Sequence, residues 1–252
     1  MNTLADILQR QAVWRGGAVP AVPAMPAAPT GFAGLDAELP GGGWPAGGLV
    51  EVLCRAEGIG ELQIVLPALA ALTAAGHRVA WLAPPHLPYA PALLAAGVHL
   101  EHLTVVRAPG RRDALWAAEQ ALRARAFHAL LLWLPRANYA ELRRLAVAAQ
   151  AGPGFALAFR PPEAACESSP AVLRLALEPG LEVALNTGLE TEAIRVPSRL
   201  AVRILKRRGA PAAAPLPVHI ERPVTARPAH ALGRTPFSAA PAPGAVARAC
   251  AA

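Results

Sequence analysis

The sequence has few of the residues that mark disulfide-rich, metal-binding or membrane-spanning proteins. Only three cysteines occur among 252 residues, and their number and spacing fit neither a disulfide framework nor a zinc site. Although 54% of the residues are hydrophobic, no uncharged run reaches the roughly 18–20 residues that a membrane-spanning helix needs. The opening MNTLADILQRQ has an early acidic residue and no long apolar core, so we expect no signal peptide. These absences favour a cytoplasmic protein without a membrane partner.

Acidic residues are also scarce relative to basic ones. The chain has 17 aspartates and glutamates against 24 lysines and arginines, which gives a formal net charge of +7. This balance favours an acidic partner or nucleic acid. The arginines are, however, spread along the chain. The base composition of the genome alone could produce the same excess of arginine, so the sequence leaves both explanations open.

Side-chain combinations typical of catalytic or metal sites are missing as well. No Ser/His/Asp or Cys/His combination has the spacing of a catalytic site. The histidines His86, His99, His102 and His128 do not lie at metal-ligand spacing with any cysteine or carboxylate. The sequence therefore predicts no catalytic residues, no metal and no cofactor.

Short apolar runs alternate with amphipathic segments through the middle of the chain. We predict strands at 49–53, 78–83, 103–107, 128–134 and 155–160, and helices at 61–75, 89–96, 111–125 and 139–150. Near-continuous apolar strands that alternate with helices predict an α/β fold, with a mostly parallel sheet and helices on both faces. The later segments 172–178, 181–186 and 201–206 have no helices between them, and predict an antiparallel C-terminal extension at the sheet edge.

Composition divides the chain into three parts. Residues 1–29 are expected to form an N-terminal helix, at 3–14, followed by a Pro/Ala linker. That helix either packs on its own domain or docks on another protein. Residues 30–220 are expected to form the folded domain, in which Trp44 anchors the glycine-rich turn PGGGWPAGG on the core. The Pro/Ala-rich residues 221–252 are expected to form a flexible tail.

The stretch 30–72 has the strand, loop and helix order of a phosphate-binding loop. A Walker A loop needs G-x-x-x-x-G-K-[ST]. With Gly60 as the second glycine, Arg55 replaces the first, and Glu61 stands at the lysine position. A carboxylate that faces a triphosphate is repelled by about 1–4 kcal/mol per charge pair. The sequence thus predicts a degenerate phosphate-binding loop.

The chain resembles the RecA-like fold over about residues 30–220, and more closely the ImuA family of translesion-synthesis accessory proteins, with SulA cell-division inhibitors as relatives. The most specific segment is AWLAPPHLPYAPALLAAGVHLEHL, residues 80–103. The resemblance aligns Pro85 with the glutamate that activates water in RecA, and Trp133 with its Walker B aspartate. With Glu61 at the Walker lysine, it implies a RecA-fold pseudo-ATPase that is not an enzyme.

The resemblance also implies a basic contact element near the end of the domain. The segment AVRILKRRGAPAAAPLPVHI matches a late RecA strand that reaches toward the neighbouring protomer's nucleotide. Lys206 and Arg208 take its two basic positions, with Arg207 between them. This implies a contact with RecA or phosphate, including a weak contact with DNA, although an exposed basic strand end would look the same.

Two binding functions follow from the resemblance. The ImuA family implies a non-catalytic scaffold of the DNA-damage (SOS) response. It would bind a Y-family polymerase homologue (ImuB-like), a DnaE-type error-prone polymerase through that complex, and RecA, at the nucleoid after damage. SulA implies cell-division inhibition through FtsZ. The segments DALWAAEQALR, WLPRA, LRRL, AFRP and LKRRG favour ImuA, whereas PGGGWP, GIGEL and APPH fit both. A third possibility, an ATP-hydrolysing recombinase paralogue, conflicts with the three replaced positions.

Overall fold

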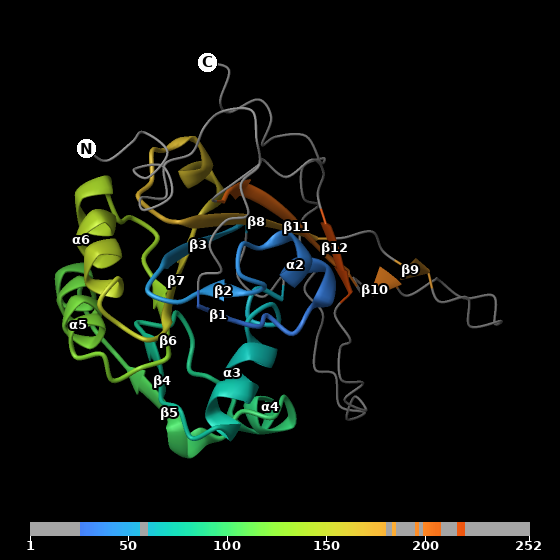
Figure 1. Ribbon diagram of the computed structural model, residues 1–252, viewed down its shortest axis with the longest axis horizontal. Coiled ribbons are helices and arrows are strands. Elements are labelled where there is room, and N and C mark those ends of the chain that lie inside the picture. Colours follow the sequence, from blue (N-terminus) through green and yellow to red (C-terminus); the bar gives the residue numbers. More distant parts are fainter. Residues whose placement is uncertain are drawn as a thin grey trace, which may run out of the picture.

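A sheet of eight strands with helices on both faces forms the body of the protein (Figure 1). The computed structural model describes residues 26–55, 60–179, 183–184, 195–196, 199–207 and 216–219. The strand order in the sheet is β12-β11-β8-β3-β7-β6-β4-β5. In chain order these strands are β3 Leu49–Cys54, β4 Val79–Leu82, β5 Leu103–Val106, β6 Ala129–Trp133, β7 Phe155–Arg160, β8 Leu173–Pro179, β11 Arg199–Lys206 and β12 Leu216–His219.

Most of the sheet is parallel. β3 pairs in parallel with β7 and β8, β6 pairs in parallel with β7 and β4, and β4 pairs in parallel with β5. β11 pairs antiparallel with β8 and β12. Two short ladders lie outside this sheet: β1 Ala27–Ala28 with β2 Trp44–Pro45, and β9 Val183–Ala184 with β10 Arg195–Val196. The predicted α/β class with a mostly parallel sheet is confirmed.

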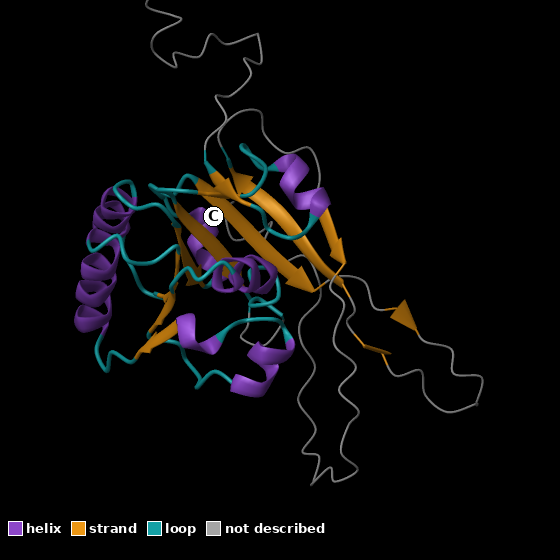
Figure 2. Cartoon of the chain, turned by 60° about the horizontal axis from the view of Figure 1, so that its bottom comes forward, coloured by secondary structure: helices purple, strands orange, loops and turns teal. Residues whose placement is uncertain are grey.

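The helices cover the sheet on both sides, as Figure 2 shows. The helices of the described residues are α2 Ala33–Glu38, α3 Leu66–Ala74, α4 Ala90–Ala95, α5 Arg111–Arg123 and α6 Tyr139–Ala149, with the 3-10 helices η1 Leu100–His102 and η2 Pro162–Cys166. Apolar side chains of α2, α3 and α4 join one buried cluster, and those of α5 and α6 join a second cluster across the sheet. The helical cover predicted for both faces is therefore present.

Alternate residues of each inner strand enter these two clusters. In β4, Val79 and Trp81 belong to the core beneath α3, whereas Ala80 and Leu82 belong to the core beneath α5 and α6. All four are buried. Because successive strand side chains point to opposite faces, a strand that is apolar at every position needs cover on both sides. This is the physical reason why the near-continuous apolar runs predicted a doubly covered sheet.

The helix predicted at 61–75 begins later than expected. Residues 61–65 form turns, and α3 starts at Leu66. Pro67 lies in the first helical turn, where its missing N–H and fixed φ are tolerated. The amide groups of Gln63 and Val65 donate to the carbonyl groups of Gly60 and Leu62, respectively. The loop after β3 is thus longer than a phosphate-binding loop that runs directly into its helix.

The predicted antiparallel extension is wrong at its first strand. β8, expected as segment 172–178, lies inside the sheet and runs parallel to β3. A parallel neighbour needs a crossover of about a dozen residues, and residues 161–172, which include η2, supply it without an α-helix. The segment 201–206 is antiparallel as predicted. Of the predicted strand 181–186, the structure describes only β9, which pairs with β10 outside the main sheet.

Trp44 anchors the glycine-rich turn on the core, as predicted. Its side chain is fully buried and stacks on Phe155 with ring centroids 5.7 Å apart. A Cβ at Gly43 would lie 2.1 Å from the carbonyl oxygen of Ala28, so only glycine fits this close approach. The turn therefore holds β1 and β2 against the end of the sheet.

Several predictions fall beyond the described residues. The N-terminal helix at 3–14, most of the linker and the tail at 221–252 lie there. Within the described ranges, no helix is both long and apolar enough to cross a membrane.

Candidate functional site

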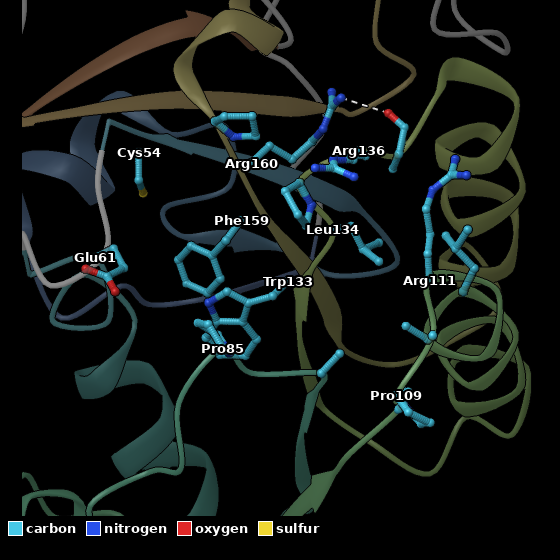
Figure 3. A pocket seen from close by; sticks show the side chains of 18 of the residues that line it. Cys54, Glu61, Pro85, Pro109, Arg111, Trp133, Leu134, Arg136, Phe159 and Arg160 are labelled. Atoms are coloured by element: carbon cyan, nitrogen blue, oxygen red, sulfur yellow. Dashed lines mark hydrogen bonds between the residues drawn. The ribbon is translucent and has the colours of Figure 1, made fainter.

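A cavity of about 810 Å³ lies where the parallel strands end (Figure 3). It is bounded by the ends of β3, β6 and β7, by the segments after β4 and β5, and by the first turn of α5. We call this side of the sheet the carboxyl edge. In α/β proteins ligands bind at this edge, in cavities of roughly 300–1,000 Å³. Position and size make this cavity the candidate functional site.

The residues of the predicted degenerate nucleotide site, which came from the loop pattern and from the RecA resemblance, meet at this cavity. Arg55, Glu61, Pro85 and Trp133 all line it. Gly60 directly precedes Glu61 and has φ +104°, which favours glycine. Parallel strands bring the segments at their ends together, so positions far apart in the sequence converge. Their interpretation as a former nucleotide site stays a prediction.

Two stacked aromatic side chains, Trp133 and Phe159, line the cavity, and Trp81 packs against Trp133 outside the lining. Trp81, Trp133 and Phe159 come from the strands β4, β6 and β7. The ring centroids lie 5.6 Å apart for Trp81 and Trp133, and 4.9 Å apart for Trp133 and Phe159. Trp81 and Phe159 are buried, and Trp133 is half-buried between them. The position aligned with the Walker B aspartate thus presents a flat apolar surface instead of a carboxylate.

The charged side chains around the cavity are mostly basic. Of the residues that the structure describes, Arg55, Arg111, Arg136 and Arg160 line it, against one acidic residue, Glu61. Arg111 forms an ion pair with Glu141 of α6, whereas the exposed Arg55 and Arg136 form none with any residue that the structure describes. The cavity therefore attracts anionic groups.

Cys54, the last residue of β3, is a free thiol on the cavity wall. Burial and, to a smaller degree, the charge of Glu61 raise the pKa of Cys54 from 9.0 to about 12. A nucleophilic cysteine needs the opposite shift, because the thiolate is the reactive form. Cys54 is thus unsuited to nucleophilic catalysis at neutral pH.

A buried network of charges lies beside the cavity, and sequence reasoning missed it. Glu51 of β3 is fully buried and accepts from Arg160 Nη1 at 2.8 Å and from Arg174 Nε at 2.6 Å. Arg160 Nη2 also donates to the Ala137 carbonyl (Figure 3) and to Glu167, each at 2.8 Å. The signal was present, because a charged residue within an apolar strand such as LVEVLC is rarely buried without a partner.

The network keeps Arg160 charged. Burial acts to lower the pKa of Arg160, but its hydrogen bonds to Glu167 and Glu51 outweigh burial and raise that pKa above its ordinary value. Arg174 also donates to the carbonyl groups of Ala164 and Glu167. These bonds hold η2 against the sheet, next to the cavity wall that Arg160 forms.

The basic element predicted near residue 206 lies away from the cavity. Lys206 is opposite Arg174 in the β11–β8 ladder, near the start of the parallel strands. Its Nζ donates to the carbonyl oxygen of Ser169 at 2.8 Å, and Arg207 pairs with Glu38 of α2 at 2.8 Å. Arg208 lies outside the described residues. The predicted contact of Lys206, Arg207 and Arg208 with RecA or phosphate stays a prediction.

The histidines do not form a metal site in the described parts of the chain, where no three His, Cys, Asp or Glu side chains cluster. His77 and His128 stack with ring centroids 3.8 Å apart. They precede β4 and β6, at the edge of the sheet opposite to the cavity. Burial and the neighbouring His77 lower the pKa of His128.

Comparison with known proteins finds a partial similarity. No family model matches the chain. The cell division inhibitor SulA of Edwardsiella piscicida is 37% identical over 83 residues, which cover 33% of this chain and 49% of that protein. The crystal structure of SulA from Pseudomonas aeruginosa matches with a TM-score of 0.39 and 27% identity, over 46% of this chain and 98% of that chain. The chain thus spans about half the length of the curated relative, and this part is similar in sequence to SulA.

Proposed function

We propose that this protein acts by binding other proteins in the bacterial SOS response, and that its first candidate activity is inhibition of cell division. The 37% identity to a cell division inhibitor SulA over 83 residues supports this proposal. The expected partner is then the division protein FtsZ. The activity requires a binding surface and no catalytic group.

A second candidate is the translesion-synthesis scaffold of the ImuA family. One observation favours it: the similarity to SulA takes up only 33% of the chain, whereas the eight-stranded sheet spans residues 49–219. The similarity to a division inhibitor therefore leaves much of this sheet without a counterpart. The partners would then be a Y-family polymerase homologue, a DnaE-type polymerase and RecA. Both candidates place the protein in the cytoplasm, and the second places it at the nucleoid after DNA damage.

Both candidates include a RecA-like core with a degenerate phosphate-binding loop and no ATPase activity. Phosphoryl transfer depends on charge neutralisation and positioning. The aligned positions hold Glu61, Pro85 and Trp133, and all three line the cavity. Glu61 places a negative charge where the lysine would neutralise phosphate, and Pro85 and Trp133 have no carboxylate to activate water or to hold magnesium. This supports a binding role for the cavity.

The purified full chain is therefore expected to release no phosphate from ATP above the buffer rate. The measurement is a phosphate-release assay with and without single-stranded DNA, with RecA as the positive control. ATP turnover that survives repeated purification and disappears in Glu61→Ala would contradict the pseudo-ATPase proposal.

The partner is tested by immobilising the tagged full chain and presenting FtsZ, RecA and the Y-family polymerase homologue separately at physiological salt. Retention of FtsZ, together with filamentous cells on expression, supports division inhibition. Retention of the polymerase homologue or RecA without FtsZ supports the scaffold. If none of the three is retained, neither candidate stands.

A further inference from the structure

We propose that the cavity at the carboxyl edge is one part of a longer groove that binds an extended acidic segment of a partner protein. The inference rests on the proposed function, since it assumes a protein partner, and it names the surface and the chemistry that such a partner would use.

The groove continues beyond the cavity. A second hollow of about 430 Å³ lies between the proline-rich segment 83–88 and residues 105–109. It shares Ala83, Pro85, Ala108 and Pro109 with the cavity, so the two hollows lie next to each other. Together they run from Arg160 on β7 to the edge strand β5. We call the two hollows the carboxyl-edge groove. An extended chain that crosses the shared residues would occupy both hollows, whereas a compact small molecule would fill only one.

The walls of the groove are rigid and apolar. Six of its lining residues are prolines: Pro84, Pro85, Pro88, Pro109, Pro135 and Pro161. Proline has a fixed φ, so these walls lose little conformational freedom on binding. Trp133 and Phe159 add aromatic surface in the larger hollow, and Leu87, which is 71% exposed, lines the smaller one. These surfaces favour a partner segment with apolar side chains.

The basic side chains of the groove favour a partner segment that is acidic. Among the described residues, five arginines, namely Arg55, Arg107, Arg111, Arg136 and Arg160, line the groove, with one acidic residue, Glu61. Arg111 already pairs with Glu141, and Arg160 pairs with Glu51 and Glu167. The exposed Arg55, Arg107 and Arg136 therefore carry the positive charge that the groove offers to a partner. Arg160 is 4% exposed, and its Nε has no hydrogen-bond partner in the described part of the chain. Complementary charge steers association and fixes register.

The start of α3 offers few backbone donors to a phosphate group. N–H groups at a helix N-terminus commonly hold phosphate. In the segment before α3, however, the N–H groups of Gln63, Val65 and Leu66 donate to carbonyl groups within the same turns, and Pro67 has no N–H group. Arginine side chains bind carboxylates and phosphates alike, so binding measurements with an acidic peptide and with ATP distinguish the two occupants.

The first test measures fluorescence anisotropy of two labelled peptides with the full chain. The acidic peptide is fluorescein-Asp-Phe-Glu-Leu-Asp-Glu, and its basic counterpart has lysine in place of each acidic residue. We expect only the acidic peptide to bind. Arg136→Glu reverses a charge on the groove wall and should weaken binding at least about tenfold. Arg143→Glu makes the same charge change on an exposed α6 residue outside the groove, and should change binding less than about twofold.

Leu87→Asp tests the apolar end of the groove and is also expected to weaken binding. Because Arg136 and Leu87 are exposed, neither variant should alter the thermal melt. Three results would overturn the inference: no binding of the acidic peptide, equal weakening by Arg136→Glu and Arg143→Glu, or binding of ATP alone with displacement of the peptide. The last would identify the groove as a nucleotide site.

The second test repeats the partner capture with the same variants. If the wild-type chain retains a partner and Arg136→Glu does not, the groove is the binding surface. If both retain it equally, the groove inference fails while the proposed function stands. If the wild-type chain retains none of the three partners, the proposed function fails, and the peptide measurement alone decides whether the groove binds acidic segments.

Discussion

At the scale of single residues, the buried charges are the least expected feature of this protein. Glu51 is fully buried between Arg160 and Arg174, on three adjacent strands. Glu167 supplies the second negative charge, so the two arginines are balanced. A buried ion pair adds little over an apolar pair, but the loss of one partner leaves an uncompensated charge. Glu51 is therefore the residue whose substitution tests the network.

Glu51→Gln is expected to lower the free energy of unfolding by about 3 kcal/mol, since it removes the charge that both arginines share. The matched control is Glu101→Gln, which removes a carboxylate with 71% side-chain exposure and should cost less than about 0.5 kcal/mol. Urea unfolding followed by circular dichroism measures both. Equal stability of the two variants would show that the network contributes nothing to folding.

Cys54 is expected to resist alkylation while the protein is folded. With a pKa of about 12, the thiolate fraction at pH 8 is on the order of one in 10⁴. Peptide mapping by mass spectrometry after iodoacetamide treatment measures labelling at this cysteine alone. The label should appear rapidly in denaturant and very slowly without it. Fast labelling of the folded chain would mean that the thiol is reactive and would reopen a catalytic role.

At the scale of helices and strands, local patterns predicted the elements well and their pairing less well. The apolar runs that became β4, β6 and β7 were visible because each strand is buried on both faces. The position of β8 was not visible, since a crossover through η2 has no helical periodicity. The contacts of Glu51 with Arg160 and Arg174 span 109 and 123 positions in the chain, and no local pattern reports pairing over such distances.

In the candidate site, too, some residues were predictable from the sequence and others were not. Arg55 and Glu61 were found from the strand–loop–helix pattern, and Pro85 and Trp133 from the resemblance to the RecA-like fold; all four line the cavity. The aromatic partner Phe159 was not found, because its role follows from the order of β6 and β7 in the sheet. Residues at strand ends are thus predictable, and their neighbours depend on the sheet order.

The helix α6 offers a test at this scale because it begins with a capping box. Asn138 Oδ1 accepts from the Glu141 amide at 3.0 Å, and Glu141 Oε2 accepts from the Asn138 amide at 2.9 Å. Asn138→Ala should cost about 1 kcal/mol of stability, whereas Asn138→Asp, which keeps the acceptor, should cost much less. Urea unfolding of both variants gives the comparison. Equal losses would show that the cap is not what stabilises the start of α6.

At the scale of the whole molecule, the sheet separates two candidate surfaces. The carboxyl-edge groove lies where the parallel strands end, and Lys206 lies near where they begin. Arg207 ties this second region to α2 through Glu38. Because the two surfaces share no residue, substitutions in one should add to those in the other. One chain can therefore present two separate surfaces to two partners, as a scaffold would require.

The extent of the folded unit is tested by two truncations. Truncation after residue 220 keeps β12, which ends at His219, and so keeps every strand of the eight-stranded sheet. We expect a melting temperature within a few degrees of the full chain, because the removed residues are rich in alanine and proline.

Truncation after residue 198 removes β11 and β12, and exposes the edge of β8 with its buried Leu175 and Leu177. An unprotected apolar edge promotes aggregation, so this shorter chain should precipitate or melt much earlier. Thermal melts and size-exclusion chromatography distinguish the two outcomes. A large loss of stability on truncation after residue 220 would show that the tail packs on the domain, and a stable chain of 198 residues would show that the antiparallel end of the sheet is dispensable for folding.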